Sequence, residues 1–266
     1  MCSKTTIAMK NAKTFVKFSS FIPYILVVVS VSVVASVFLF LKPIAQNAHY
    51  HAFANEFNFC GISNFANIIS NLGFVLVGAI GLHVCIKHKQ FNLVHITLVL
   101  GIFLTGFGSA YYHFAPNNST LVWDRIPMTL IFSSFFALIL SKYFSEKTAR
   151  IVWVINASIG ILSVLYWQYT ESLGRGDLRL YAIVQFLPML LIIIMLLLNQ
   201  QTNKQLFKTL VYVMFWYIVA KLFEYFDHHI FEIIHLISGH PLKHIAASIA
   251  TYYMLALLKP RNDFTN

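Results

Sequence analysis

Long apolar stretches separated by short polar segments dominate the pattern of this chain. Eight of them are nearly free of charged residues and run near residues 21–41, 66–86, 94–112, 121–141, 151–167, 178–198, 206–226 and 240–258. About 20 apolar helical residues cross the hydrocarbon core of a bilayer, so each stretch predicts a transmembrane helix. The fifth stretch is short, and the seventh contains Lys221 and Glu224 within its apolar run.

The first stretch also has a feature of a secretory signal peptide, because four basic residues precede it: Lys4, Lys10, Lys13 and Lys17. Its apolar run is longer than the roughly 7–15 residues of a signal peptide, and no clean Ala-x-Ala cleavage site follows it. We therefore expect a retained anchor, with residues 1–45 forming a cytoplasmic basic tail and this first helix.

Composition indicates that the solvent of this chain is mostly lipid. Of the 266 residues, 58% are hydrophobic and only 11% are charged. An average soluble domain has about a quarter of its residues charged, and disordered chains combine low hydropathy with high charge. Both classes are excluded, and the pattern predicts an all-α integral membrane protein. The longest segment between spans, residues 42–65, is expected to be an outer loop.

The net charge of +10 is compatible with a nucleic-acid-binding surface or with the positive-inside rule of membrane proteins. The placement of the basic residues distinguishes the two, because loops on one side of the membrane hold thirteen of the 19. These thirteen are Lys4, Lys10, Lys13, Lys17, Lys87, Lys89, Lys142, Lys147, Arg150, Lys204, Lys208, Lys259 and Arg261. The bias predicts that both termini are cytoplasmic, and it argues against nucleic acid as a partner.

Five polar residues stand at the ends of spans, where ionisable groups are costly and are therefore candidates for function. They are Ser109, His113, Asp124, His240 and His244. In the predicted orientation, the third span ends on the outer side, and the fourth and eighth spans begin there. All five side chains are therefore expected at one depth on the outer side of the membrane.

His240 and His244 are four residues apart, which places both imidazoles on one face of a helix. Such a pair can bind one metal ion, and His113 is expected at the right depth to be the third ligand. Three histidines with a fourth position left open are typical of catalytic zinc. The alternative is a chance pair in a chain with 11 histidines. Interfacial residues or rival ligands are also expected in the outer loop before the last span: His228, His229 and His235.

The other polar residues of the spans admit a structural or a functional role. Asp124 can simply pair with Arg125, and Ser109 can be a small residue at a helix contact. Lys221 and Glu224 are three residues apart and form an ion pair inside the bundle or bind a substrate head group. Hydrogen bonding between helices, with support of the site as the alternative, is expected of three residues in the second span: Asn67, Ser70 and Asn71.

Four motifs resemble those of the alkaline ceramidase family, and more closely those of its bacterial branch. They are NFANIISNL from Asn64, GSAYYHFAP from Gly108, LVWDRIPM from Leu121 and SGHPLKH from Ser238. The family pattern has a Ser four residues before a His, an Asp eleven residues after that His and before Pro-Met, and a C-terminal H-x-x-x-H. The matching positions are Ser109, His113, Asp124, Pro127, Met128, His240 and His244.

This resemblance covers about residues 50–258 and implies a fold and an activity. The fold is a bundle of seven transmembrane helices around an intramembrane zinc ion, here residues 46–266, with the first helix added to make eight spans. The activity is hydrolysis of the amide bond of ceramides to a sphingoid base and a fatty acid. The implied zinc ligands are His113, His240 and His244, and the implied catalytic pair is Ser109 and Asp124. A wider superfamily of related receptors and lipid-remodelling hydrolases shares these motifs.

The implied chemistry is metal-assisted amide hydrolysis, for which bound zinc polarises the carbonyl group and lowers the pKa of water. Asp124 is expected to act as general base and then as general acid, and Ser109 to orient the water or stabilise the oxyanion. The expected partner is a ceramide-like membrane lipid, and no obligate protein partner is inferred. The bacterial resemblance predicts an inner-membrane protein whose site faces the periplasm.

Eukaryotic members of the family also bind calcium near the start of their first helix. The nearest counterparts here are Glu56, Asn58 and Asn64, which are the candidates for a second metal site. They supply one carboxylate, whereas a hard cation prefers several carboxylate or carbonyl oxygens. We therefore do not expect calcium to be bound.

Two other classes of membrane protein remain as alternatives. A retinal protein would use Lys221 for a Schiff base, and a transporter or receptor would use the polar cluster without turnover. Neither alternative explains why Ser109, His113, Asp124 and the H-x-x-x-H pair occur together.

Overall fold

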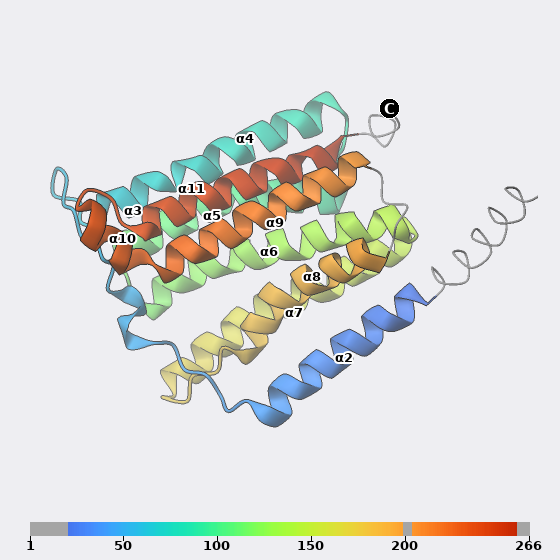
Figure 1. Ribbon diagram of the computed structural model, residues 1–266, viewed down its shortest axis with the longest axis horizontal. Helices are drawn as coiled ribbons and strands as arrows, with labels where there is room; N and C mark the ends of the chain where they lie inside the picture. Colours follow the sequence, from blue (N-terminus) through green and yellow to red (C-terminus); the bar gives the residue numbers. More distant parts are fainter. Residues whose placement is uncertain (1–20, 199–203, 260–266) are drawn as a thin grey trace, which may run out of the picture.

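The structure, a computed structural model, describes residues 21–198 and 204–259 (Figure 1). The basic tail expected within residues 1–20 and Arg261 lie outside the described residues. In chain order the elements are α2 (Ile22–Phe40), η1 (Ala48–His51), α3 (Phe65–Ser70), α4 (Leu72–Lys87), α5 (Leu93–Phe114), α6 (Asn118–Tyr143), α7 (Glu146–Ser172), α8 (Arg179–Leu198), α9 (Lys204–Tyr225), α10 (Asp227–Ile234), α11 (Gly239–Met254) and η2 (Leu255–Leu258). The predicted all-α class is confirmed.

Seven segments of the described chain are long and apolar enough to cross a membrane, with α3 and α4 counted together. They coincide with the first seven predicted spans. The eighth is α11, which has 16 residues and continues directly into the four residues of η2. With a rise of about 1.5 Å per α-helical residue and about 2.0 Å per 3-10 residue, the two extend about 32 Å. That length suffices for a bilayer core of about 30 Å, and a multi-pass membrane protein is confirmed.

Three boundaries differ from the predicted ones. The second span is interrupted, because Asn71 separates α3 from α4. The fifth span starts earlier, at Glu146, because the Ser145 side chain accepts a hydrogen bond from the backbone nitrogen of Thr148 and so caps α7. A loop was expected before the last span, but α10 forms there and buries Asp227. Each difference depends on local hydrogen bonding that hydropathy does not report.

The helices α5, α6 and α11 form the centre of the bundle. α5 packs against α4 and α6, α6 also contacts α7 and α8, and α11 packs against α9 and α4 (Figure 1). α2 lies at the edge against α8, and its buried residues are Ile22 and Leu26. The other seven spans therefore build most of the interior, and the first one adds Ile22 and Leu26 to it.

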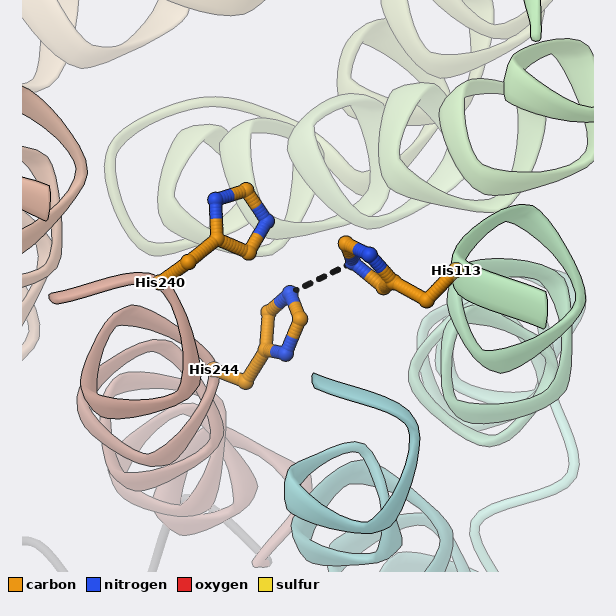
Figure 2. Close-up of side chains that lie close together, drawn as sticks. All are labelled: His113, His240 and His244. Carbon is orange, nitrogen blue, oxygen red and sulfur yellow. Dashed lines mark hydrogen bonds between the residues drawn. The ribbon is translucent and has the colours of Figure 1, made fainter. Parts of the chain in front are cut away.

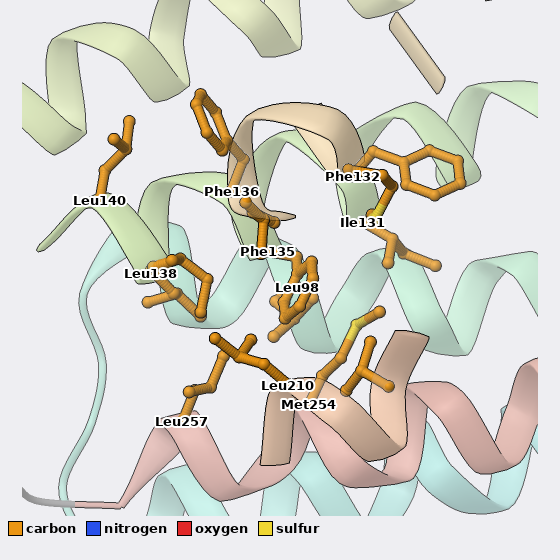
Figure 3. Close-up of a cluster of buried hydrophobic side chains, with 14 of the residues drawn as sticks. Leu98, Ile131, Phe132, Phe135, Phe136, Leu138, Leu140, Leu210, Met254 and Leu257 are labelled. Atoms are coloured by element: carbon orange, nitrogen blue, oxygen red, sulfur yellow. The ribbon is translucent and has the colours of Figure 1, made fainter. Parts of the chain in front are cut away.

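The main hydrophobic core lies where α5 begins and α11 ends (Figure 3). Leu98, Phe135 and Leu257 are fully buried in it. Large apolar side chains also cover the outside of the bundle, and Leu197 is 75% exposed. Such a surface is favourable only in lipid, where apolar side chains need not be turned inward. The opposite end of the bundle remains available for polar groups.

The connection before α8 ties this opposite end together. The Arg179 guanidinium donates hydrogen bonds to both carboxylate oxygens of Asp177 at 2.9 and 2.7 Å, and to the carbonyl oxygen of Leu41 at 2.7 Å. This contact holds the pKa of the Asp177 carboxyl below its usual range. Arg179 thereby joins the end of α2 to the start of α8.

Candidate functional site

Three histidines converge at the end of the bundle that carries α3 and α10 (Figures 1 and 2). His113 lies in the last turn of α5, and His240 and His244 lie in the first two turns of α11. Their ring centroids are 4.8 to 5.0 Å apart, and Nε2 of His113 is 3.3 Å from Nε2 of His244. All three side chains are buried. The structure brings together the three residues that were predicted as metal ligands.

The three imidazoles fit a metal ion. Two nitrogens bound tetrahedrally to zinc at about 2.05 Å are about 3.3 Å apart, which is the distance between the Nε2 atoms of His113 and His244. Nδ1 of His113 and Nε2 of His240 are buried without a hydrogen-bond partner among the described residues. Buried polar atoms without a partner are rare in proteins. A cation bound among the three rings would satisfy Nε2 of His240, which the protein leaves unpaired.

Ser70 orients His244 from the neighbouring helix. Its Oγ lies 2.8 Å from Nδ1 of His244 and 3.0 Å from the carbonyl oxygen of Asn67. A hydroxyl has one proton, and the carbonyl can only accept it, so Ser70 donates to Asn67 and accepts from Nδ1–H of His244. Nε2 of His244 is then unprotonated and points toward His113, as a metal ligand must be.

Asp227 positions His240 through the backbone. Its carboxylate accepts hydrogen bonds from the backbone nitrogen of His240 at 2.6 Å and from that of Ala54 at 3.2 Å. Gly239 permits this close approach, because a Cβ atom there would lie 2.1 Å from the carbonyl oxygen of Phe223. The start of α11, the end of α9 and the outer segment (residues 41–64, between α2 and α3) are therefore held together at the histidines.

The outer segment covers the histidine cluster. The Phe53 ring lies 4.6 Å from the His113 ring and 4.8 Å from the His240 ring, measured between centroids. Asn64 donates a hydrogen bond to the carbonyl oxygen of His113 at 3.2 Å. Covering by Phe53 lowers the local polarity around the imidazoles and separates them from bulk water.

The three candidates for a second metal site have separate roles in the structure. Asn58 caps a turn by accepting a hydrogen bond from the backbone nitrogen of Gly61, while Glu56 is exposed. Asn64 directs its amide nitrogen to His113. These contacts lend no support to a second metal site.

Ser109 and Asp124 lie side by side next to the histidines. Ser109 is one turn before His113 on α5, and its side chain interacts with the buried carboxylate of Asp124 on α6. Both line a cavity of about 390 Å³, which His244 also lines. Arg125 does not form the simple ion pair with Asp124 that was the structural alternative, because its guanidinium turns to Gln46.

The cavity combines a polar end with apolar walls. The Glu224 carboxylate accepts hydrogen bonds from Nζ of Lys221 at 2.8 Å and from Nζ of Lys243 at 3.1 Å. All three residues line the cavity. The expected ion pair of Lys221 with Glu224 is therefore present. Lys221 is also the residue that a retinal protein would use for its Schiff base. The remaining walls are mostly apolar and include Phe74, Met128, Ile131, Phe132, Phe186, Ala247 and Met254. An amphiphilic molecule fits such a cavity better than a polar one.

The three rival histidines do not join the cluster. His228, His229 and His235 are exposed on or just after α10. His229 faces Glu232 at 3.7 Å. Across the described residues, His113, His240 and His244 form the sole group of three or more histidine, cysteine or acidic side chains that converges.

Sequence reasoning did not assign roles to four residues that shape this site. Asp227 and Phe53 act through contacts between distant segments, so no local pattern marks them. Lys243 received no role, and Arg125 was considered only as an ion-pair partner of Asp124, although each is adjacent in sequence to a predicted site residue. An ionisable residue near the end of a span is by itself a candidate for function, and Lys243 and Arg125 both meet this criterion.

Comparison with known proteins agrees with this geometry. The sequence profile of the ceramidase family matches residues 58–262, which include the three histidines, Ser109 and Asp124 but not α2. No curated protein matches the chain. Because the profile covers well over half of its length, the chain belongs to the ceramidase family.

Proposed function

We propose that this protein is a zinc-dependent intramembrane hydrolase that cleaves the amide bond of ceramide-type lipids into a sphingoid base and a fatty acid. The observation that carries the proposal is the convergence of three buried histidines beside a Ser–Asp pair at the polar end of an apolar cavity. Membership of the ceramidase family supports the class of substrate.

His113, His240 and His244 would hold the metal, and three nitrogen ligands are the set typical of catalytic zinc. When bound, zinc supplies Lewis-acid polarisation of the amide carbonyl and activates water as a nucleophile. Ser70 keeps the metal-facing nitrogen of His244 unprotonated. Asp227 keeps the first turn of α11 in place against the outer segment.

Asp124 would carry the proton during hydrolysis. Its carboxylate accepts a proton from the attacking water, and the same proton passes to the amine nitrogen as the C–N bond breaks. Ser109 donates its one proton to this carboxylate and orients it. Once Asp124 has taken the proton of the water, the Ser109 hydroxyl can turn that hydrogen bond to the developing oxyanion. The second proton of the water stays on the acyl product, so the products are a carboxylic acid and a free amine.

The cavity explains how a lipid would be held. Phe132, Met128 and Met254 form apolar walls for hydrocarbon chains, and the Lys221–Glu224–Lys243 network places fixed charges at the polar end. A lipid would enter laterally from the bilayer, with its amide at the depth of Asp124. Another lipid with an amide or ester bond at this depth is the alternative substrate.

We further propose that residues 1–45 form an anchor separate from the catalytic bundle, which spans residues 46–266. The peripheral place of α2 and the extent of the family match support this division. The proposed location is a bacterial inner membrane, with both termini cytoplasmic and the site on the periplasmic side.

Metal content and lipid hydrolysis measured on the same purified samples test the proposal. The wild-type protein should hold about one zinc ion per chain and release fatty acid from ceramide. His240→Ala, and the double variant that also carries His244→Ala, should lose zinc and activity together. Asp124→Asn should keep zinc while the rate falls about 100-fold or more.

The matched control is His229→Ala, which removes an exposed histidine on α10 and should change neither quantity. Zinc that remains stoichiometric in the double variant would refute the metal assignment. Full activity of Asp124→Asn would refute the assigned proton carrier.

A further inference from the structure

A second cavity lies at the basic end of the bundle, opposite the histidines (Figure 1). It has a volume of about 190 Å³ and is bounded by the start of α5, by the end of α6 and the start of α7, and by the segment that includes η2. Three basic side chains line it, Lys142, Arg150 and Lys259, and among the described residues Glu146 is the one acidic side chain that does so. It shares no lining residue with the cavity beside Asp124, so a molecule bound here is not the lipid that is hydrolysed.

The positive charge of this cavity exceeds the negative charge. Glu146 precedes Arg150 by four residues on α7, which is the spacing of a helical ion pair. Within the described part of the chain, however, it forms no salt bridge with Arg150 or Lys259. Glu146 lies instead in the first turn of α7, where the helix dipole stabilises a carboxylate. Three cations and a single carboxylate around one space favour the binding of an anion.

The start of α5 adds to the same attraction. Four successive residues, from Asn92 to His95, line the cavity. Asn92 caps the helix, because its side chain accepts a hydrogen bond from the backbone nitrogen of His95 at 2.9 Å. The N-terminal end of a long helix carries partial positive charge and attracts anions. The helix dipole of α5 and the basic side chains therefore act on one space with the same sign.

His95 supplies a donor on the buried wall of the cavity. The residue is 8% exposed and lines the cavity. Its Nδ1 is enclosed without a partner, whereas its Nε2 is neither enclosed in this way nor bonded to another described residue. An enclosed N–H without an acceptor is rarer than an enclosed acceptor without a donor, so the proton of the neutral ring belongs on Nε2. An oxygen in the cavity would accept from this N–H.

The arrangement of these donors favours a phosphate over a carboxylate. The basic side chains and the imidazole come from α5, α6, α7 and the segment after η2, so they surround a ligand from several directions. A phosphate offers oxygens in several directions, and a guanidinium binds it with two parallel hydrogen bonds. Leu93, Leu138 and Leu257 also line the cavity, so a ligand with apolar carbon next to its phosphate fits it as well.

We infer that this cavity is a binding site for a phosphate anion. Arg150 and Lys259 bind its oxygens from the open side, and Nε2–H of His95 binds it from the buried wall. The phosphate belongs to the head group of an anionic phospholipid in the adjoining leaflet or is free in solution. A bound phosphate joins the starts of α5 and α7 to the end of the last span, and therefore stabilises the folded bundle.

Thermal unfolding of the full-length protein in detergent tests the site. Phosphatidylglycerol, inorganic phosphate and phosphatidylcholine are titrated separately, and the midpoint of unfolding gives an apparent Kd for each. Phosphatidylglycerol should raise the midpoint and saturate, whereas phosphatidylcholine, whose choline cation cancels its phosphate charge, should not. Saturable stabilisation by inorganic phosphate as well would identify free phosphate as a ligand, and its absence would identify the lipid head group.

Three variants on α7 separate this site from general attraction to a basic surface. Arg150→Gln should weaken binding of the stabilising anion about tenfold, as for the loss of a hydrogen bond to a charged group. Glu146→Gln removes a like charge and should strengthen binding about threefold. Lys147→Gln is the matched control, because Lys147 is an exposed cation between these two residues that does not line the cavity. It should change the apparent Kd by about twofold or less.

Several results would overturn the inference. These are equal weakening in Arg150→Gln and Lys147→Gln, an unchanged Kd in Arg150→Gln, equal stabilisation by phosphatidylcholine, and no stabilisation by either anion. Zinc content and lipid hydrolysis in phosphatidylcholine should be the same in Arg150→Gln as in the wild-type protein, because the cavity shares no residue with the histidine site. Loss of zinc in this variant would show a general structural defect instead of a lost phosphate site.

Discussion

At the scale of single residues, the site depends on hydrogen bonds that set protonation states. Ser70 is the clearest case, because a hydroxyl that donates to the carbonyl oxygen of Asn67 accepts from Nδ1–H of His244. Nε2 of His244 is then free to bind a cation beside His113. A serine with no charge therefore decides whether an imidazole is a ligand.

Replacing Ser70 with alanine should weaken zinc binding by about 10- to 100-fold, as expected when the partner of a metal-binding histidine is removed. Competition with a chelator of known affinity measures this change. The control is Ser163→Ala, which removes another buried serine whose hydroxyl bonds only to its own helix at Gly160. If both variants retain wild-type zinc affinity, Ser70 does not orient His244.

At the scale of helices, the site requires α5 and α6 to approach closely. Gly108 lies one residue before Ser109, and a Cβ atom there would be 2.0 Å from the carbonyl oxygen of Trp123. The absent side chain lets the α6 backbone come within reach, which brings Ser109 next to Asp124. Small residues commonly serve helix contacts in membranes in this way.

Gly108→Ala should therefore push α5 away from α6 and destabilise the protein by about 1–3 kcal/mol, the usual cost of overpacking. The thermal unfolding midpoint in detergent should fall, and hydrolysis should fall with it. Gly101→Ala tests the same helix pair, where the added Cβ would be 3.1 Å from a side-chain atom of Ile131, so its effect should be smaller. Equal stability of the two variants would contradict the role of Gly108.

At the scale of the whole molecule, the basic connections and the candidate active site lie at opposite ends of the bundle. The histidines lie at the end with α3 and α10, whereas the basic connections between α4 and α5 and between α6 and α7 lie at the other end (Figure 1). The positive-inside rule supports the proposal that the basic end is cytoplasmic. The proposed orientation is therefore a property of the fold and not of any single loop.

Labelling with a membrane-impermeant maleimide tests this orientation. Cys60 is exposed in the outer segment, between α2 and α3, so it should react in intact spheroplasts. In a variant that combines Cys60→Ser with Lys147→Cys, the new cysteine, at the start of α7, should react only after the membrane is permeabilised. Labelling in the reverse order would place the site on the cytoplasmic side.

The sequence by itself determined the class of fold, the number of spans and the set of candidate ligands. Hydropathy is a property of consecutive residues, so spans follow from it directly, and a shared depth for His113, Asp124 and His240 follows from the order of the spans. The break at Asn71, the helix α10 and the cap at Ser145 were not predicted, because each arises from hydrogen bonds rather than from apolar periodicity.

Only the tertiary structure decided which side chains at that depth meet. It brought Nε2 of His113 to 3.3 Å from Nε2 of His244 and placed Asp227 and Phe53 against the histidines. It also directed the Arg125 guanidinium toward Gln46 instead of Asp124. The physical reason is that depth fixes one coordinate of a residue in a membrane, whereas helix rotation and helix packing fix the other two. Those depend on contacts between segments far apart in the chain.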